Sequence, residues 1–418
     1  MQRQLWRALG LPLLILGSSD TLSAQQALTW EQVHERFLAN NPIVSASRIF
    51  VRESEANQVT AGLRPNPQLA VVLDQYRIFR PNPLQPFQNA QWTSTVSELF
   101  ERRHKRELRV ESAKLATSGA TTDELDLERQ LTFSLRGAFI QALQAKSILE
   151  LAAENLKYYD EVIRVNRERL KAGDIAQSDF DRIELQRAQF ESDLVNAQVN
   201  LRTARITLLA IINEPSTPVD SFDVAGEFDF KETILLPQEL HQAALDARPD
   251  LQSATTAVNK AKVDNKLAWA NGSWDPSLGL EYQRTQPDNT AGVSLALPIR
   301  IFDKNQGEKA RTSLEIQRAQ KIREGIVTGV YHDVDSAYET VESTRRLLRP
   351  YRDHYIPQAG RVRDTVSFAY RNGGASLLDF LDAQKSYRDA QLAYRNLIGS
   401  YLAAVNQLNL AVGWEVLQ

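Results

Sequence analysis

The sequence contains no cysteine, and its single methionine is the first residue. The lack of cysteine excludes disulfide bonds, thiolate nucleophiles and a lipid anchor on an N-terminal cysteine. The five histidines are scattered, and no two of them stand at a spacing typical of metal ligands. We therefore expect no metal site and no cofactor.

Neither sign of charge dominates, because 49 lysines and arginines stand against 52 aspartates and glutamates, for a net charge of -3. A chain without a basic excess is not expected to bind nucleic acid. The sequence also lacks a phosphate-binding loop, a nucleophile elbow and an HExxH motif. An enzyme is accordingly the least favoured class of protein.

A long apolar run occurs only near the N-terminus. Arg3 and Arg7 precede the run Ala8–Gly17, and a polar stretch then ends at Ala24. This layout predicts a secretory signal peptide over residues 1–24, with an N-terminal anchor as the alternative. No later run approaches the roughly 20 apolar residues of a transmembrane helix. The exported chain is therefore either soluble or inserted in a membrane through β-strands.

Proline is missing from residues 87–214, 299–349 and 358–418, and long helices can form where proline is absent. In the first of these stretches, apolar or small residues alternate at spacings of four and three, which is typical of coiled-coil packing. The members of this seam are Leu131, Leu135, Ala138, Ala142, Ala145, Leu149, Ala152, Leu156, Tyr159, Ile163, Asn166 and Leu170. A helix over residues 102–172, ended by Gly173, would be about 100 Å long.

The same pattern returns in two later segments, and this indicates an internal repeat. One seam runs from Phe190 to Ile211, and another runs from Ala390 to Ala411 at a shift of 200 positions. That shift also brings Gly173 onto Gly373. We predict a first repeat over residues 25–214, a linker over 215–238 and a second repeat over 239–418.

Each repeat also contains two short segments with alternating apolar and polar residues, which predict β-strands. Their expected ranges are 68–76, 91–100, 277–284 and 292–300. Strands of this length suit a transmembrane barrel, although a small soluble sheet would have the same pattern. Four strands are too few to close a barrel, so several copies of the chain would have to share one. The expected fold is mainly α-helical with a transmembrane β part.

Two segments carry a resemblance to a known family. "RLKAGDIAQSDFDRIELQRAQ", Arg169–Gln189, and "YRNGGASLLDFLDAQKSYRDAQLAY", Tyr370–Tyr394, resemble the outer membrane efflux protein (TolC) family. With the strand pairs and the signal peptide, the resemblance covers nearly the whole mature chain. "VSLALPIRIFDKNQGE", Val293–Glu308, resembles the heavy-metal branch that includes CzcC and CusC.

The resemblance implies a homotrimer with a shared 12-stranded barrel in the outer membrane lipid and a helical barrel across the periplasm. It also implies a function, the exit duct of a tripartite efflux pump for drugs or metal cations. Its partners would be a periplasmic adaptor and an inner membrane transporter of the resistance-nodulation-division (RND) type. A type I secretion duct and a soluble periplasmic scaffold or adaptor are the alternatives.

Two aspartates near the second tip are candidates for a functional site. In the family, acidic residues three apart face the lumen at the periplasmic tip, and Asp379 and Asp382 match both positions. Three chains would then form an acidic ring that favours cations. Asp379 also stands three residues after Ser376, as in a helix-capping box. Asp179, its counterpart in the first repeat, is expected to be a cap or a contact between helices.

Other residues near the tips take possible roles from the resemblance. Gly173, Gly373 and Tyr370 match the region that receives the adaptor, although the glycines could simply end helices. Ala375 stands where TolC has an arginine that helps to hold the tip closed, so the closed-state contacts must differ. The candidates for such contacts are Arg182, Lys385 and Arg388.

Overall fold

The structure is a computed structural model that describes residues 27–75, 90–231, 236–285 and 287–416. The signal peptide predicted over 1–24 lies outside these residues, as does position 76 of the first predicted strand. The first half of the chain contains α1 (Trp30–Asn40), α2 (Pro42–Gly62), β1 (Gln68–Asp74), β2 (Gln91–Leu99), α3 (Lys105–Ala172) and α4 (Gln177–Ile211).

The second half has the same order of elements. It contains α5 (Pro237–Ala247), α6 (Pro249–Asn271), β3 (Ser277–Thr285), β4 (Asp288–Ala296), α7 (Gln306–Pro350), α8 (Ile356–Arg371) and α9 (Leu377–Val412). A short 3-10 helix, Val219–Ser221, lies between the halves. Where α3 is continuous, its counterpart is divided into α7 and α8 by a π-helical turn at Tyr351–Tyr355, next to Pro350. Fold and element order agree with the expected mainly helical chain with four strands.

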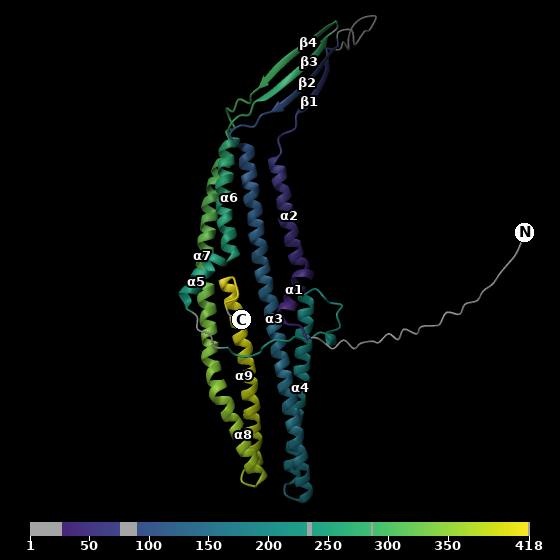
Figure 1. Cartoon of the computed structure of the whole chain (residues 1–418), viewed down its shortest axis with the longest axis vertical. Helices are drawn as coiled ribbons and strands as arrows, with labels where there is room; N and C mark the ends of the chain where they lie inside the picture. Colours follow the sequence, from purple (N-terminus) through teal and green to yellow (C-terminus); the bar gives the residue numbers. More distant parts are fainter. Residues whose placement is uncertain (1–26, 76–89, 232–235, 286, 417–418) are drawn as a thin grey trace, which may run out of the picture.

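The molecule is elongated, with the sheet at one end and two helical hairpins at the other (Figure 1). The spine is α3, whose 68 residues span about 100 Å at 1.5 Å per residue. Near the sheet α3 packs against α2 and α6, and toward the hairpin tips it packs against α4 and α9. No helix in the described part of the chain is both long enough and apolar enough to cross a bilayer.

The four strands form one antiparallel sheet in the order β1-β2-β3-β4. The fourth strand was predicted too late in the sequence, because it covers Asp288–Ala296 and not 292–300. Thr285 already pairs with Asp288, so Asn289–Gly292 belongs to the ladder rather than to a hairpin loop. The ladder stops before Pro298, whose nitrogen carries no hydrogen to donate. The strand predicted over 91–100 ends at Leu99, and that predicted over 277–284 extends to Thr285.

The predicted seam on α3 is confirmed, because every one of its members from Leu131 to Leu170 is buried or half-buried. Many of these residues are alanines, which allow neighbouring backbones to approach closely. At Gly399 of α9, an added Cβ would lie 2.4 Å from Oε1 of Gln144 on α3. Glycine lowers helix propensity, but here it leaves room for the end of this flexible side chain.

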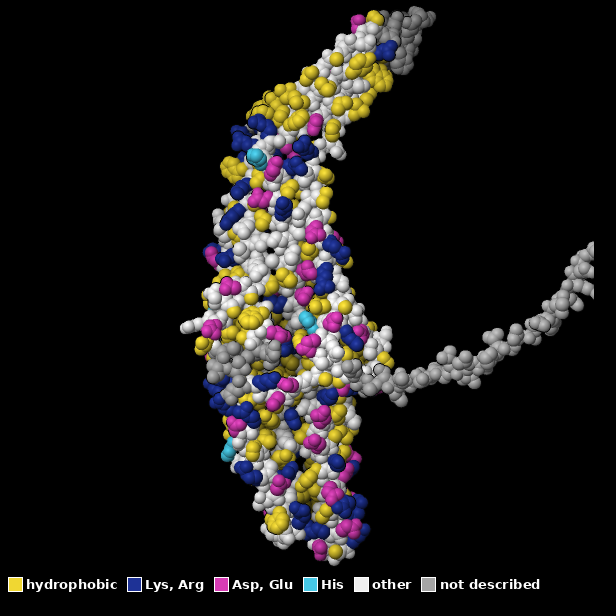
Figure 2. Space-filling model, viewed as in Figure 1, with side chains coloured by type: hydrophobic (Ala, Val, Ile, Leu, Met, Phe, Trp, Pro, Cys, Tyr) yellow, Lys and Arg dark blue, Asp and Glu magenta, His cyan; other side chains and the backbone are white. Residues whose placement is uncertain are grey.

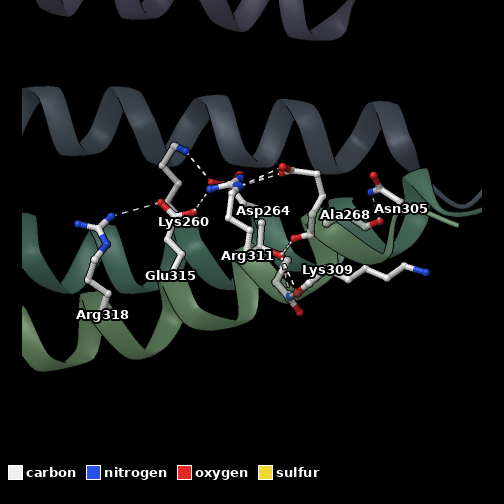
Figure 3. Close-up of polar contacts among 11 residues, drawn as sticks. Lys260, Asp264, Ala268, Asn305, Lys309, Arg311, Glu315 and Arg318 are labelled. Carbon is white, nitrogen blue, oxygen red and sulfur yellow. Dashed lines mark hydrogen bonds and ion pairs between the residues drawn. The ribbon is translucent and has the colours of Figure 1, made fainter. Parts of the chain in front are cut away.

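Polar side chains set the positions of the helices that lead to the sheet (Figure 3). On α6, Asp264 accepts hydrogen bonds from Ser112 of α3 and from Lys260. Asn305, just before α7, donates a 2.7 Å hydrogen bond to the carbonyl of Ala268 on α6. These bonds join α3, α6 and α7 and fix where β3 and β4 leave the helical layer.

Two buried polar residues join helices that stack end to end. Asn41 caps α2 through Oδ1, which accepts from Ile43 and Val44, and its Nδ2 donates to Ile211 at the end of α4. Arg248 has the corresponding place between α9 and α6. Its guanidinium donates to the carbonyl of Ala411 and to the carboxylates of Asp250 and Asp333.

The junction at Arg248 gives a stability prediction. Arg248→Met should lower the free energy of unfolding by about 3 kcal/mol, because it leaves a half-buried Asp250 without its cation. The measurement is thermal unfolding of the purified protein, followed by circular dichroism at 222 nm. The control is Arg164→Met, which removes an exposed cation from an i,i+3 pair on α3 and should leave Tm unchanged. Equal Tm values for the two variants would show that Arg248 does not hold the junction.

Candidate functional site at the hairpin tips

The two hairpins turn at glycines with left-handed backbone conformations. Gly173 has φ 82° and follows α3, and Gly373 has φ 76° and follows α8. The amides after the helices close the turns, for example that of Gly374, which donates to the carbonyl of Ala369 at 2.8 Å. An added Cβ at Gly173 or Gly373 would meet nothing within 4 Å. Backbone conformation therefore explains both glycines, and the surface beside them is open.

Asp379 is part of a capping box at the start of α9. Its amide donates to Oγ of Ser376 at 3.1 Å, and its carboxylate accepts from the Ser376 amide at 3.1 Å and from the hydroxyl at 2.6 Å. These hydrogen bonds favour the ionised form and lower the pKa of Asp379. The capping role that the sequence left open is present in the structure.

Asp382 lies one turn further along α9, and both carboxylates are on the exposed side of the helix. In the first hairpin the residue at the start of α4 is Ala176, which has no side-chain oxygen, so Asp179 cannot form the same box. Asp179 instead lies half-buried near Tyr370 of the second hairpin, where its charge helps to raise the pKa of the tyrosine.

Tyr370 connects the two hairpins. Its ring is buried and stacks on Phe380 at 4.8 Å, and its hydroxyl lies 3.2 Å from Oδ1 of Asn166 on α3. The guanidinium of Arg169 lies 5.0 Å from the ring centre. Burial is the main reason that the pKa of Tyr370 is raised, so the hydroxyl stays protonated and can donate to Asn166.

The three candidate cations have different surroundings. Arg388 reaches from α9 to α4, where it lies 3.6 Å from Asp193 and packs over Phe190. Lys385 pairs with Asp389 on its own helix at 2.9 Å. Arg182 is exposed and forms no ion pair within the described part of the chain. Of the three, only Arg388 joins the hairpins.

Two polar contacts across the hairpins were not predicted from the sequence. The buried Gln384 of α9 donates to the hydroxyl of Tyr158 on α3 at 3.2 Å. Gln144 of α3 donates to Asn396 of α9 at 3.0 Å. One feature of the sequence pointed to Asn396, because the shift of 200 positions between the repeats brings Asn196 onto it. No such feature pointed to Gln384, since its place beside the seam looks like an ordinary surface position.

A groove of about 290 Å³ lies between α3, α4 and α9. Asparagines from all three helices line it, together with Arg388 and small apolar residues. Those asparagines are Asn155, Asn196, Asn200 and Asn396. Within the described residues, no group of three or more histidine, aspartate or glutamate side chains could hold a metal ion.

Comparison with known proteins agrees with this geometry. The family model described as "Outer membrane efflux protein" matches residues 240–414, from α5 to the end of α9. The cobalt-zinc-cadmium resistance protein CzcC of Cupriavidus metallidurans is 22% identical over 92% of this chain and 90% of its own length. The resemblance to the outer membrane efflux protein family that the sequence predicts is confirmed by these matches. Proteins of that family are efflux channels of the outer membrane and not enzymes, which agrees with the function predicted from the sequence.

Other relatives match over similar lengths. The pyoverdine export outer membrane protein OpmQ of Pseudomonas aeruginosa is 24% identical over 99% of this chain and 88% of its own. Solved structures agree with the fold. VceC of Vibrio cholerae has a TM-score of 0.76 at 16% identity, and the match covers 92% of this chain and 96% of VceC. CusC has a TM-score of 0.75 at 16% identity over 92% of both chains.

The two unequal helix starts give a paired prediction. Ser376→Ala should lower Tm at neutral pH, because the capping box loses its hydroxyl. Ala176→Ser should raise Tm, since Asp179 already stands at the position that completes a box. Asp379 has a lowered pKa in the folded protein, so the cap stabilises above the ordinary aspartate pKa and is lost as the pH falls through the lowered value.

The effect of Ser376→Ala on Tm should therefore be large at pH 7 and shrink in acid, below the ordinary pKa of aspartate. Thermal unfolding by circular dichroism at several pH values measures it. A Tm difference that stays constant with pH would contradict a charge-assisted cap at Asp379.

Proposed function

We propose that three copies of this chain form one efflux duct, and the observation that carries the proposal is the open sheet. Both edge strands, β1 and β4, lack a partner on one side within the described residues. Unpaired backbone groups are costly in lipid, and four strands cannot close on themselves. Pairing β4 of one copy with β1 of the next gives a barrel of twelve strands without edges.

The helical part supports the same arrangement. Exposed apolar side chains follow α4 at one side of the layer, namely Leu185, Val195, Val199 and Ile206. Others follow α7 and α8 at the opposite side, namely Leu347, Val362 and Phe368. A head-to-tail ring would bury one set against the other, because such contacts join different surfaces of neighbouring copies.

The absence of cysteine allows a direct test of the trimer. A cysteine at Val71 on β1 is combined with a second cysteine at Ala291, Val293 or Leu295 on β4. Oxidation should give, for at least one pair, a covalent species of three chains on a denaturing gel. Each single-cysteine variant is the control and should give at most a dimer. Failure of all three pairs in well-folded protein would reject the shared barrel.

At the end of the molecule opposite the sheet, the hairpin tips of three copies would form the aperture of the duct. Three copies of Asp379 and Asp382 would form an acidic ring that favours cations. Gly173, Gly373 and Tyr370 are the proposed docking region for a periplasmic adaptor, supported by the open surface beside both glycines. Opening would separate the hairpins at Tyr370, Gln384 and Arg388. In that picture Arg182, which has no ion pair among the described residues, would contact another chain, and Lys385 could do so by leaving Asp389.

The remaining partner is an inner membrane transporter, which we infer to be of the RND type. Metal cations and drugs are the proposed cargo. Support comes from the names of relatives, since one is a cobalt-zinc-cadmium resistance protein and another exports pyoverdine. The chain would act as a passive exit, and the transporter would select the cargo.

Conductance in a planar bilayer tests the duct and its aperture. The wild-type protein should give small, cation-selective currents that trivalent cations block from the side of the tips. Asp379→Asn/Asp382→Asn should lose the block and most of the selectivity, because the ring has lost its charge.

The matched control is Asp174→Asn/Asp181→Asn, which removes two exposed carboxylates from the tip of the first hairpin. It should keep both the block and the selectivity. If the two double variants behave alike, Asp379 acts only as a helix cap. If the wild-type protein forms no channel, the proposed duct is rejected.

A further inference from the structure

A basic belt surrounds the place where the sheet meets the helices. We call the segments 62–66, 99–109, 269–276 and 297–311 the junction collar. Its acidic residues are Glu101, Glu107, Asp275, Asp303 and Glu308. Its basic residues are twice as many, namely Arg64, Arg102, Arg103, Lys105, Arg106, Arg109, Arg300, Lys304, Lys309 and Arg311. The whole chain, by contrast, has a net charge of -3.

The acidic residues of the collar neutralise only part of this charge. Lys105 pairs with Asp275, Arg109 with Glu101 and Arg311 with Glu308. No carboxylate pairs with the four collar cations Arg64, Arg103, Arg300 and Lys304 in the part of the chain that the structure describes. Nε of Arg300 is buried and has no hydrogen-bond partner there. The collar therefore presents cations that are free to bind an anion.

Two further cations of the collar lie against exposed tryptophans. The guanidinium of Arg102 is 4.2 Å from the centre of the Trp274 ring. The ammonium of Lys309 is 4.5 Å from the centre of the Trp269 ring. Tryptophan beside a basic side chain is typical of the boundary between a membrane and water, where the ring meets acyl chains and the cation meets headgroups.

Large apolar side chains stand next to the free cations. Ile299 is 85% exposed and Phe302 is 89% exposed. Arg300 directly follows Ile299, and Lys304 stands two residues after Phe302. Figure 2 shows dark-blue side chains gathered where the sheet begins, with yellow side chains on the sheet beyond them. Such exposed apolar side chains in a water-facing segment mark a surface that another phase covers.

We propose that the junction collar binds the headgroups of anionic phospholipids in the leaflet that faces the periplasm. Arg102, Arg300 and Lys304 contact the phosphates, while Ile299 and Phe302 enter the acyl region. The inference rests on the proposed function, which puts the sheet in the outer membrane. It goes further by naming a lipid class and the residues that select it. Without a cysteine for lipidation, charge at the collar also fixes the depth of insertion.

The test measures lipid selectivity at the collar. The full-length protein is reconstituted in nanodiscs of equal phosphatidylcholine and phosphatidylglycerol, and one of the two lipids carries brominated chains that quench tryptophan. Phosphatidylglycerol should quench more than phosphatidylcholine, and Trp269→Phe/Trp274→Phe should remove the difference. Arg102→Gln/Arg300→Gln/Lys304→Gln should lower the preference by roughly fivefold for each charge removed, and high salt should weaken it in the wild type.

Two control variants separate charge from folding. Arg102→Lys/Arg300→Lys/Lys304→Arg keeps the charges and should keep the preference. Arg164→Gln/Lys171→Gln/Lys231→Gln removes three exposed cations far from the sheet and should also keep it.

Equal quenching by both lipids in the wild type, or an unchanged preference in the glutamine variant, would overturn the collar while leaving the duct intact. If neither lipid quenches any tryptophan, including Trp92 on β2, the sheet is not in the bilayer. That result would reject the proposed function together with the collar.

Discussion

The packing of α3 against four other helices is the interaction on which the rest of the structure depends. A helix of 68 residues is too long to pack around one compact core. It is stabilised by a narrow seam of apolar and small residues that is buried against the neighbouring helices. Alanines supply much of that seam, and Gly399 of α9 leaves room for the side chain of Gln144 on α3. The seam is continuous from Leu131 to Leu170, over the part of α3 that leads to the hairpin tip.

The helices beside α3 are shorter and stack in pairs, α4 below α2 and α9 below α6. Where two helices meet end to end, the last carbonyls of one and the first amides of the next have no hydrogen-bond partner within their own helix. Each stack therefore needs other groups that form these hydrogen bonds. In the first half, the side-chain amide of Asn41 forms these hydrogen bonds. In the second half, the guanidinium of Arg248 forms them together with two carboxylates. Equivalent positions thus use different chemistry for the same task.

The hairpins are joined to each other far more weakly than the helices within each hairpin. Near the tips, the polar contacts between them are hydrogen bonds of Tyr370 and Gln384 and the ion pair of Arg388. A typical hydrogen bond contributes about 1 kcal/mol net, so separation of the hairpins costs far less than unfolding either of them. This difference in strength is what an aperture at the tips requires, since it can open while both hairpins stay folded.

The sequence alone was sufficient for the long helices, the α3 seam, the four strands and the tip glycines. Each of these follows from local rules: proline gaps, apolar spacing, alternation and a left-handed turn. Position along the chain could not reveal that Tyr370 meets Asn166 or that Arg248 joins α9 to α6, because those partners are far apart in sequence and come together only when the helices pack. The start of β4 was decided in the same way, by pairing with β3 and not by its own polar residues.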